Sequence, residues 1–311
     1  MRVIGADEVR RHLDHQLAID AVESAFVEHV AGRTAVSEPP LLRLPFDGNA
    51  RFQAKAAKVG RVIGLRVAGE RDDRHVDEGR RMLLYDADDL VPTALVDERE
   101  LYRIRVGAQI AVTVSHLRPA DSAVLTVIGA GRLARATIEA IQSATPFRSV
   151  RIHSRAPDSR ARLVQDLTGR VPGALEVVDE LPAALAVSDV VVTITTATSP
   201  VVAGADLRPG TLVVSAGGGF ECDAEVYRRC DRLIVDDWDH CVQVGDIGPL
   251  HAQGVVAPGD VAASLPEVVA GGATPPCGPT EILVAVPQGM TIVDVALAAQ
   301  LLGRLDAAGG A

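Results

Sequence analysis

The chain has 311 residues, enough for two domains of ordinary size, and 48% of them are hydrophobic while only 3% are aromatic. Its core must therefore be built from Ala, Val, Leu and Ile, which suits parallel strands covered by helices. The formal net charge of −10 argues against a nucleic-acid or anionic-membrane surface, so we expect neither partner. The four cysteines show no metal-ligand spacing, which predicts reduced thiols, no metal site and a cytoplasmic protein.

The N-terminal part of the chain predicts an α+β domain. Its helices are expected at residues 8–13, 18–31 and 99–117, and its strands at residues 2–5, 41–44, 52–57, 62–67, 82–86 and 93–97. Most of these strands follow one another without an intervening helix, so the segment lacks the strand–helix–strand rhythm of a parallel sheet. The first residues carry charges and no long apolar run, so we expect that they form neither a signal peptide nor a membrane anchor.

A glycine-rich turn follows the first strand of the next segment. Residues 124–134 read VLTVIGAGRLA, an apolar strand that breaks at Gly129 and Gly131 and passes into a helix. A strand–turn–helix of this kind binds dinucleotides, because glycine allows the pyrophosphate to approach the backbone. The helix then offers the free N–H groups of its first turn, which includes Arg132 and Leu133, to the phosphates.

The end of the following strand predicts which nicotinamide cofactor is bound. An NAD-preferring site carries Asp or Glu about 20 residues beyond the last glycine position. This chain has Ser154 and Arg155 there, and an arginine pairs with a 2′-phosphate or stacks on adenine. We therefore expect NADP, with NAD as the alternative.

From residue 121 onward the pattern alternates between strands and helices. Strands are expected at residues 124–128, 150–153, 175–178, 190–194, 212–215 and 233–235, and helices at residues 132–143, 159–167, 181–186 and 224–230. Six strands with intervening helices predict a Rossmann-type doubly wound parallel sheet. Thr195, Thr196 and Gly217 follow strands at the carboxyl edge, where such sheets bind ligands. A last helix, residues 292–305, is expected to return to the N-terminal domain.

Four segments of the chain resemble the ornithine cyclodeaminase/mu-crystallin family. They are LYRIRVGAQIAV at residues 101–112, ADSAVLTVIGAGRLA at 120–134, SLPEVVAG at 264–271 and GMTIVDVALA at 289–298. Their order and spacing agree with the family along the chain. The resemblance implies a substrate-binding and dimerisation domain made of residues 1–118 with 281–311, and an NAD(P)-binding Rossmann domain made of residues 119–280. It also implies a homodimer, whose substrate domains join their sheets, and a small amino or imino acid as substrate.

The resemblance also implies which residues bind and transform the substrate. Arg43 and Arg105 correspond to the family arginines that bind the substrate carboxylate. Arg66 stands where the family has a lysine, and an arginine keeps its proton at every physiological pH. Lys55 and Lys58, on the preceding strand, are the candidates for a replacement amine. Gln53 falls near a family glutamate, and an amide cannot act as a base.

A second departure from the family lies after the fifth strand of the parallel sheet. Members with ornithine activity carry an aspartate there, whereas this chain reads SAGGGFE at residues 215–221. Glu221 and Asp223 are expected to cap the following helix rather than to replace that aspartate. His75 and His240 are minor candidates for an acid, and the charged run around His75 is typical of a solvated loop.

These residues predict an NAD(P)H-dependent oxidoreductase that acts on the C–N bond of an amino or imino acid. An imine or ketimine reductase and an amino-acid dehydrogenase both fit, since hydride transfer needs one bound carboxylate and one proton donor. Two alternatives stay open: an ornithine or lysine cyclodeaminase that uses bound NAD⁺, and an NADPH-binding ligand carrier with little catalysis. The sequence identifies neither the substrate nor the proton donor at nitrogen.

Overall fold

The computed structural model describes all residues except 46–49, 72–78, 273–274 and 310–311. The chain divides into two compact units: residues 1–105 with 290–311 form the first unit, and residues 106–289 form the second. The sequence analysis placed the boundaries at residues 118/119 and 280/281. One long helix, α3 (Glu98–Leu117), begins in the first unit and continues into the second, so no linker marks that boundary.

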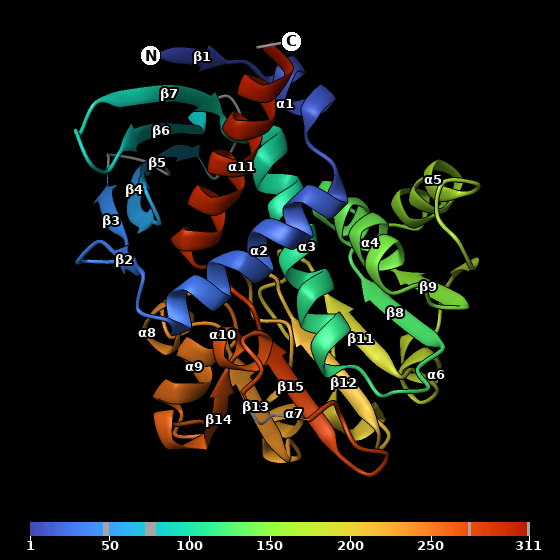
Figure 1. The fold of residues 1–311 in the computed structure, drawn as a ribbon. Helices are drawn as coiled ribbons and strands as arrows, with labels where there is room; N and C mark the ends of the chain where they lie inside the picture. Colours follow the sequence, from blue (N-terminus) through green and yellow to red (C-terminus); the bar gives the residue numbers. More distant parts are fainter. Residues whose placement is uncertain (46–49, 72–78, 273–274, 310–311) are drawn as a thin grey trace. The chain divides into compact units, whose positions relative to one another are not determined.

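The first unit is built on a seven-stranded sheet with the order β1-β7-β6-β5-β4-β2, and β3 pairs with β4 (Figure 1). The strands are β1 (Arg2–Ile4), β2 (Thr34–Val36), β3 (Leu42–Pro45), β4 (Ala50–Val59), β5 (Val62–Arg71), β6 (Arg81–Asp86) and β7 (Pro92–Asp97). Only β1 and β7 pair in parallel. The sequence analysis missed β2, because three residues are too few to show a strand period.

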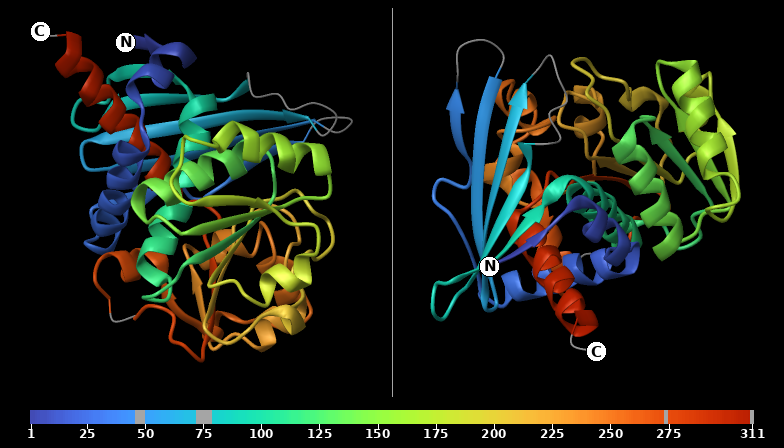
Figure 2. Two further views of the ribbon diagram at one scale, coloured as in Figure 1. Left: turned by 90° about the vertical axis from the view of Figure 1, so that its right-hand side faces the viewer. Right: turned by 90° about the horizontal axis from the view of Figure 1, so that it is seen from above.

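Helices cover one face of this sheet. The unit contains α1 (Ala6–His12), α2 (His15–Val30), which begins where Asp14 accepts the Leu17 N–H, and α11 (Thr291–Gly309). Helix α11 packs on α2 and on strands β4, β5 and β6, which confirms the prediction that the last helix returns to this domain. Gly64 permits that packing, because a Cβ there would collide with Val295 of α11. Figure 2 shows the sheet with α2 and α11 on the same side.

The two faces of the sheet differ in burial. On the α11 side Ala57, Met82 and Leu84 are buried. On the other face the alternate residues Leu65, Leu83 and Leu95 form a row of directly opposed cross-strand neighbours and are only half-buried. The row continues to Val3 on β1, which is 67% exposed, so the described helices of this unit leave an apolar sheet face open.

The second unit contains an eight-stranded parallel sheet with the order β10-β9-β8-β11-β12-β15-β13-β14. The strands are β8 (Val124–Ile128), β9 (Ser149–His153), β10 (Ala174–Val177), β11 (Val190–Thr193), β12 (Thr211–Ser215), β13 (Arg232–Val235), β14 (Val261–Ser264) and β15 (Ile282–Val286). The predicted number of six strands is wrong. Ile282–Val286, which the sequence analysis grouped with the first domain, inserts between β12 and β13, because a fully apolar five-residue strand is stable only when covered on both faces.

The strand order makes this sheet doubly wound, as predicted. The chain runs outward from β8 to β10, then crosses back to β11 and continues in the other direction, so right-handed connections place helices on both faces. The helices are α4 (Arg132–Ala144), α5 (Pro157–Leu167), α6 (Leu181–Leu185), α7 (Ala224–Arg228), α8 (Trp238–Cys241), α9 (Ile247–Ala252) and α10 (Leu265–Val269). Among the residues that the structure describes, no helix is long and apolar enough to cross a membrane.

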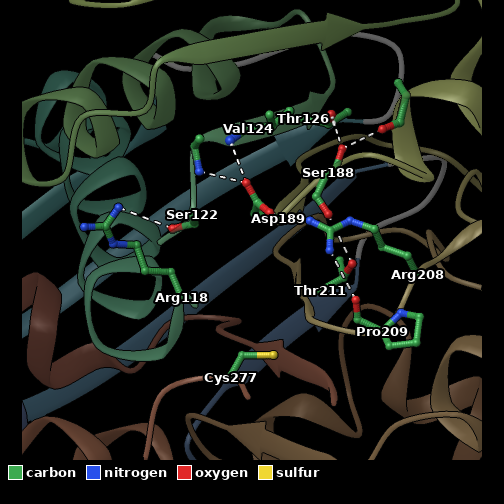
Figure 3. A network of polar contacts seen from close by, with 12 residues as sticks. Arg118, Ser122, Val124, Thr126, Ser188, Asp189, Arg208, Pro209, Thr211 and Cys277 are labelled. Carbon is green, nitrogen blue, oxygen red and sulfur yellow. Dashed lines mark hydrogen bonds and ion pairs between the residues drawn. The ribbon is translucent and has the colours of Figure 1, made fainter. Parts of the chain in front are cut away.

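The half-buried carboxylate of Asp189 joins the amino ends of two central strands (Figure 3). The Oδ2 atom of Asp189 accepts the N–H groups of Ala123 and Val124 at 2.7 and 2.9 Å, and its Oδ1 atom pairs with Arg208. The neighbouring Ser188 hydroxyl donates to Ala184 O at 2.7 Å. Asp189 therefore fixes the start of β8 against the start of β11.

We expect Asp189→Ala to lower the free energy of unfolding by about 2–4 kcal/mol, because two backbone donors lose a charged acceptor. Asp166→Ala is the control, since Asp166 is 46% exposed and its ion pair with Arg135 is worth less than about 1 kcal/mol. Urea denaturation of both variants measures the difference. Equal stabilities of the two variants would contradict this role of Asp189.

Candidate functional site

The glycine turn after β8 has the geometry of a phosphate site. Gly129 adopts a φ of +130°, its N–H donates to His153 O at 2.8 Å, and a Cβ there would collide with Ile194 O. Gly131 is the N-cap of α4, and a Cβ there would lie in open space. The first-turn N–H groups of α4, which include those of Arg132 and Leu133, have no partner within the helix. The turn therefore fits a pyrophosphate.

The residues that follow β9 form a small polar group. The Ser154 hydroxyl donates to Ala156 O at 3.0 Å, and Arg155 is exposed. The buried Arg160 of α5 donates to Ser154 O at 3.0 Å and pairs with Asp179. Arg160 thus fixes the backbone at Ser154 while the Arg155 side chain stays at the surface.

Glu221 organises the loops at the carboxyl ends of β11 and β12. It is fully buried and accepts the Thr193 hydroxyl at 2.7 Å, the Thr195 N–H at 2.6 Å and the Gly217 N–H at 2.7 Å. The prediction that Glu221 caps a helix is wrong, because its carboxylate points back to these strand ends. Asp223 does cap α7, by accepting the Val226 N–H at 3.0 Å.

A second buried carboxylate supports Glu221. Asp246 accepts the N–H of Glu221 at 2.6 Å, the Ser215 hydroxyl at 2.8 Å and the Tyr227 hydroxyl at 2.9 Å. Burial, as the largest cause, raises the pKa of both carboxyl groups above their usual values. These groups are saturated with donors, so they hold the two loops rather than exchange protons.

Hydrogen bonds within the loops already engage polar groups of two predicted cofactor residues, Thr195 and Gly217. The N–H groups of Thr195 and Gly217 are committed to Glu221, and Gly217 O accepts Gln288 Nε2 at 3.2 Å. The Thr195 hydroxyl accepts the Ala197 N–H at 3.0 Å, and Thr196 is exposed. Because the amides of Thr195 and Gly217 are engaged, we predict that the loops approach a ligand closely without donating hydrogen bonds from these two groups.

The predicted substrate residues of the N-terminal domain share one face of the first sheet. Arg43 lies directly opposite Gln53, and Lys55 lies directly opposite Arg66. Gln53 and Lys55 are two residues apart on β4, so all four side chains belong to the α11 face. Arg43 is exposed, Gln53 and Lys55 are half-buried, and Arg66 is buried.

Arg66 belongs to a buried cluster of four charged groups, which we call the arginine–carboxylate cluster: Arg66, Glu98, Arg105 and Asp294. Arg105 Nε donates to Asp294 Oδ1 at 2.6 Å, and Arg66 forms an ion pair with Glu98 and lies 3.8 Å from Asp294 Oδ2. Tyr102 packs against both arginines, with its ring centroid 5.0 Å from Arg66 Cζ and 5.2 Å from Arg105 Cζ. Arg105 lies two turns into α3 rather than at its start.

The cluster shifts the pKa values of its two carboxyl groups in opposite directions. Burial favours the neutral form of both, but the guanidinium groups of Arg105 and Arg66 keep the pKa of Asp294 below its usual value. Burial and the neighbouring Asp294 charge raise the pKa of Glu98 to about 7 despite Arg66. The pKa of Arg66 is raised by Glu98 and Asp294, so this arginine stays protonated.

The remaining predicted residues lie elsewhere. His240 is buried in α8, and its N–H donates to Asp237 at 2.8 Å. His75 falls outside the described residues. All four cysteines are free thiols. Within the described ranges, no group of three or more His, Cys, Asp or Glu side chains could hold a metal ion.

Sequence reasoning missed the two carboxyl partners of the arginines. Glu98 stands in VDERELYRIR, where an acidic residue is typical of an exposed first helical turn, so the sequence gives no sign of its burial. Asp294 does leave a sign, because it is the one charged residue in the apolar stretch GMTIVDVALA. A charge at a core position of an amphipathic helix needs a buried partner.

Comparisons with known proteins agree along the whole chain. The ornithine cyclodeaminase/mu-crystallin family matches residues 2–308. The Delta(1)-pyrroline-2-carboxylate reductase of Paracoccus denitrificans is 30% identical over 231 residues, which cover 71% of each chain. The ketimine reductase mu-crystallin of Rattus norvegicus is 24% identical and covers 95% of this chain and 94% of its own.

A solved structure shows the same fold. The Delta(1)-pyrroline-2-carboxylate reductase of Thermococcus litoralis, in complex with NADH and L-proline, superposes with a TM-score of 0.92 at 23% identity, over 99% of this chain and 98% of the other. The glycine turn, the family segments and the fold all agree with the match along the sequence. The chain therefore belongs to the ornithine cyclodeaminase/mu-crystallin family.

Proposed function

We propose that this protein is an NAD(P)H-dependent reductase of small imino acids, with the reverse amino-acid dehydrogenase reaction on the same site. The arginine–carboxylate cluster carries the proposal, because two buried guanidinium groups on adjoining elements suit a substrate carboxylate. The second unit supplies the dinucleotide turn at Gly129. The 30% identical relative is a pyrroline-2-carboxylate reductase, which supports this substrate class.

The reaction needs one hydride, one proton and a fixed carboxylate. A reduced nicotinamide supplies the hydride to the imine carbon, and a proton adds to the nitrogen, so the imine becomes an amine. Arg105 and Arg66 would bind the carboxylate attached to that carbon and fix its orientation. Arg43 and Gln53 lie on the same sheet face and would contact the rest of a small substrate. Lys55, opposite Arg66, is the amine of this face.

Arg66 also argues against efficient ornithine cyclodeamination. That reaction oxidises the amine, closes the ring with loss of ammonia and reduces the product again, so protons must move repeatedly at neutral pH. Arg66 is a poor proton carrier, because Glu98 and Asp294 raise its pKa further. Glu221 is committed to three donors and does not replace the absent family aspartate.

We expect pyrroline-2-carboxylate or piperideine-2-carboxylate to be reduced with NADPH at least about tenfold faster than ornithine or lysine releases ammonia. One preparation serves for both assays: loss of NADPH absorbance, and ammonia release with NAD⁺ added. A heat-denatured sample controls for spontaneous reactions of the imines. Rapid conversion of ornithine to proline would reject the proposal in favour of a cyclodeaminase, and cofactor binding without either reaction would indicate a ligand carrier.

The surroundings of β9 favour NADPH over NADH. Ser154 and Arg155 follow this strand, and no carboxylate stands at residues 153–155 to bind the ribose hydroxyls. Arg155 is exposed, and a guanidinium group at this position would pair with a 2′-phosphate. The solved structure of the Thermococcus litoralis reductase contains NADH, so the test of this proposal compares both cofactors.

Arg155→Ala should weaken NADPH binding roughly 10- to 100-fold and leave NADH binding nearly unchanged, because it removes one charge-assisted contact to the 2′-phosphate. Fluorescence titration with both cofactors measures the effect. Arg228→Ala, which removes a 60% exposed arginine of α7, is the matched control. Equal losses for both cofactors, or an NADH preference of the wild-type protein, would argue against an NADP site.

The open sheet face of the first unit supports a homodimer. Leu65, Leu83 and Leu95 form an apolar row there that the described helices of this unit do not cover. Apolar faces of this kind mark interaction sites, and two copies would bury them by joining their sheets across a two-fold axis. The free thiols suit a reducing compartment such as the cytoplasm.

Leu83→Glu should convert the dimer into a monomer, because it places a charge in the centre of the joined face. Size-exclusion chromatography with light scattering measures the mass, and circular dichroism verifies the fold. Val187→Glu, at a 46% exposed position of the second unit, should leave the dimer intact. A wild-type monomer, or a Leu83→Glu variant that remains dimeric, would show that this face is not the interface.

A further inference from the structure

Glu98 and Asp294, the two carboxyl groups of the arginine–carboxylate cluster, differ in their hydrogen bonds. It is fully buried, and within the described residues neither of its oxygens has a hydrogen bond, although Arg66 lies in ion-pair contact. Asp294, in contrast, accepts Arg105 Nε at 2.6 Å. Arg66 is therefore the main group that stabilises the charge of Glu98, with smaller contributions from Arg80 and Arg105.

Each element around Glu98 contributes a charged or titratable group. Arg66 comes from β5, Asp294 from α11, Arg105 and Tyr102 from α3, and Arg80 from the residue before β6. Burial and Asp294 favour the neutral acid, whereas the three arginines favour the carboxylate. These opposing effects place the pKa of Glu98 at about 7.

The four buried groups of the cluster carry two positive and two negative charges, so they are neutral together. A bound substrate carboxylate would add a third negative charge at Arg66 and Arg105. An uncompensated buried charge is costly, but one proton on Glu98 removes it. Arg80 acts on Glu98 and Lys55 acts on Asp294, but both side chains are only half-buried, so water weakens the positive charge that they add to the site.

We propose that Glu98 and the substrate carboxylate compete for Arg66, and that Glu98 takes up one proton when the carboxylate binds. The exchange is balanced: the Glu98 carboxylate becomes a neutral acid, and the ligand carboxylate takes its place at the guanidinium. The site keeps its net charge, and the substrate arrives together with a proton. The inference rests on the proposed function, because it assigns the substrate carboxylate to Arg66.

The sign of the pH dependence follows from linkage. Below the pKa of Glu98 the acid is already protonated and the carboxylate binds without proton uptake. Above it, each unit of pH makes the required proton about tenfold less available, so ligand affinity falls. With a pKa of about 7, the dissociation constant should rise about fivefold between pH 7 and pH 8.

Isothermal titration calorimetry of the NADPH-loaded protein with pyrrole-2-carboxylate tests the exchange. This ligand keeps its carboxylate ionised and its ring nitrogen uncharged near neutral pH, so any proton uptake belongs to the protein. Titrations in two buffers of different ionisation enthalpy should give an uptake of about 0.9 proton at pH 8 and about 0.1 at pH 6. Glu98→Gln should abolish the uptake and make the dissociation constant independent of pH over this range.

Glu100→Gln is the matched control, because Glu100 lies on the same helix, pairs with Arg10 and Arg103, and should leave the uptake unchanged. Tight binding by the wild-type protein without proton uptake would overturn the inference while leaving the proposed function intact. Uptake that persists in Glu98→Gln would also overturn it. If that variant does not fold, the wild-type titrations at the two pH values decide. Failure to bind pyrrole-2-carboxylate and to reduce imines would contradict the proposed function itself.

Discussion

The candidate substrate site depends on the compensation of two buried arginines by two buried carboxyl groups. Burying a guanidinium group without a partner costs several kcal/mol. Asp294 on α11 and Glu98 on α3 make the burial of Arg105 and Arg66 possible, and they tie these helices to β5. Because of this compensation, both arginines already form ion pairs within the protein. In our proposal a ligand carboxylate competes with an internal one for Arg66, so its affinity depends on the protonation of Glu98.

The second unit uses buried carboxylates in a different way. Glu221 and Asp246 receive donors from loops and strand ends on all sides, and their function is positional. They hold the loops after β11 and β12 at the edge where a doubly wound sheet binds its ligand. At the opposite edge, Asp189 connects β8 with β11. Charged groups thus fix both ends of a sheet whose central strands are mostly aliphatic.

The sequence predicted those parts of the molecule that local patterns determine. The glycine turn, most of the strands and the return of α11 to the first unit follow from periodicity or from the family segments. Strand β15 was missed because its pairing partners lie 50 or more residues away, and an apolar run can be a helix as readily as a strand. Glu98 was missed and the role of Glu221 was predicted wrongly for a related reason, since the burial of an acidic side chain depends on contacts distant in sequence.

A crystal structure of the protein with NADPH and L-proline tests the central claim most directly. The account predicts that the proline carboxylate lies within hydrogen-bond distance of the Arg66 and Arg105 guanidinium groups, with Glu98 no longer paired to Arg66. It also predicts that the proline α-carbon lies within ~4 Å of nicotinamide C4, in the range for hydride transfer. A carboxylate bound elsewhere, with the Arg66–Glu98 pair intact, would contradict it.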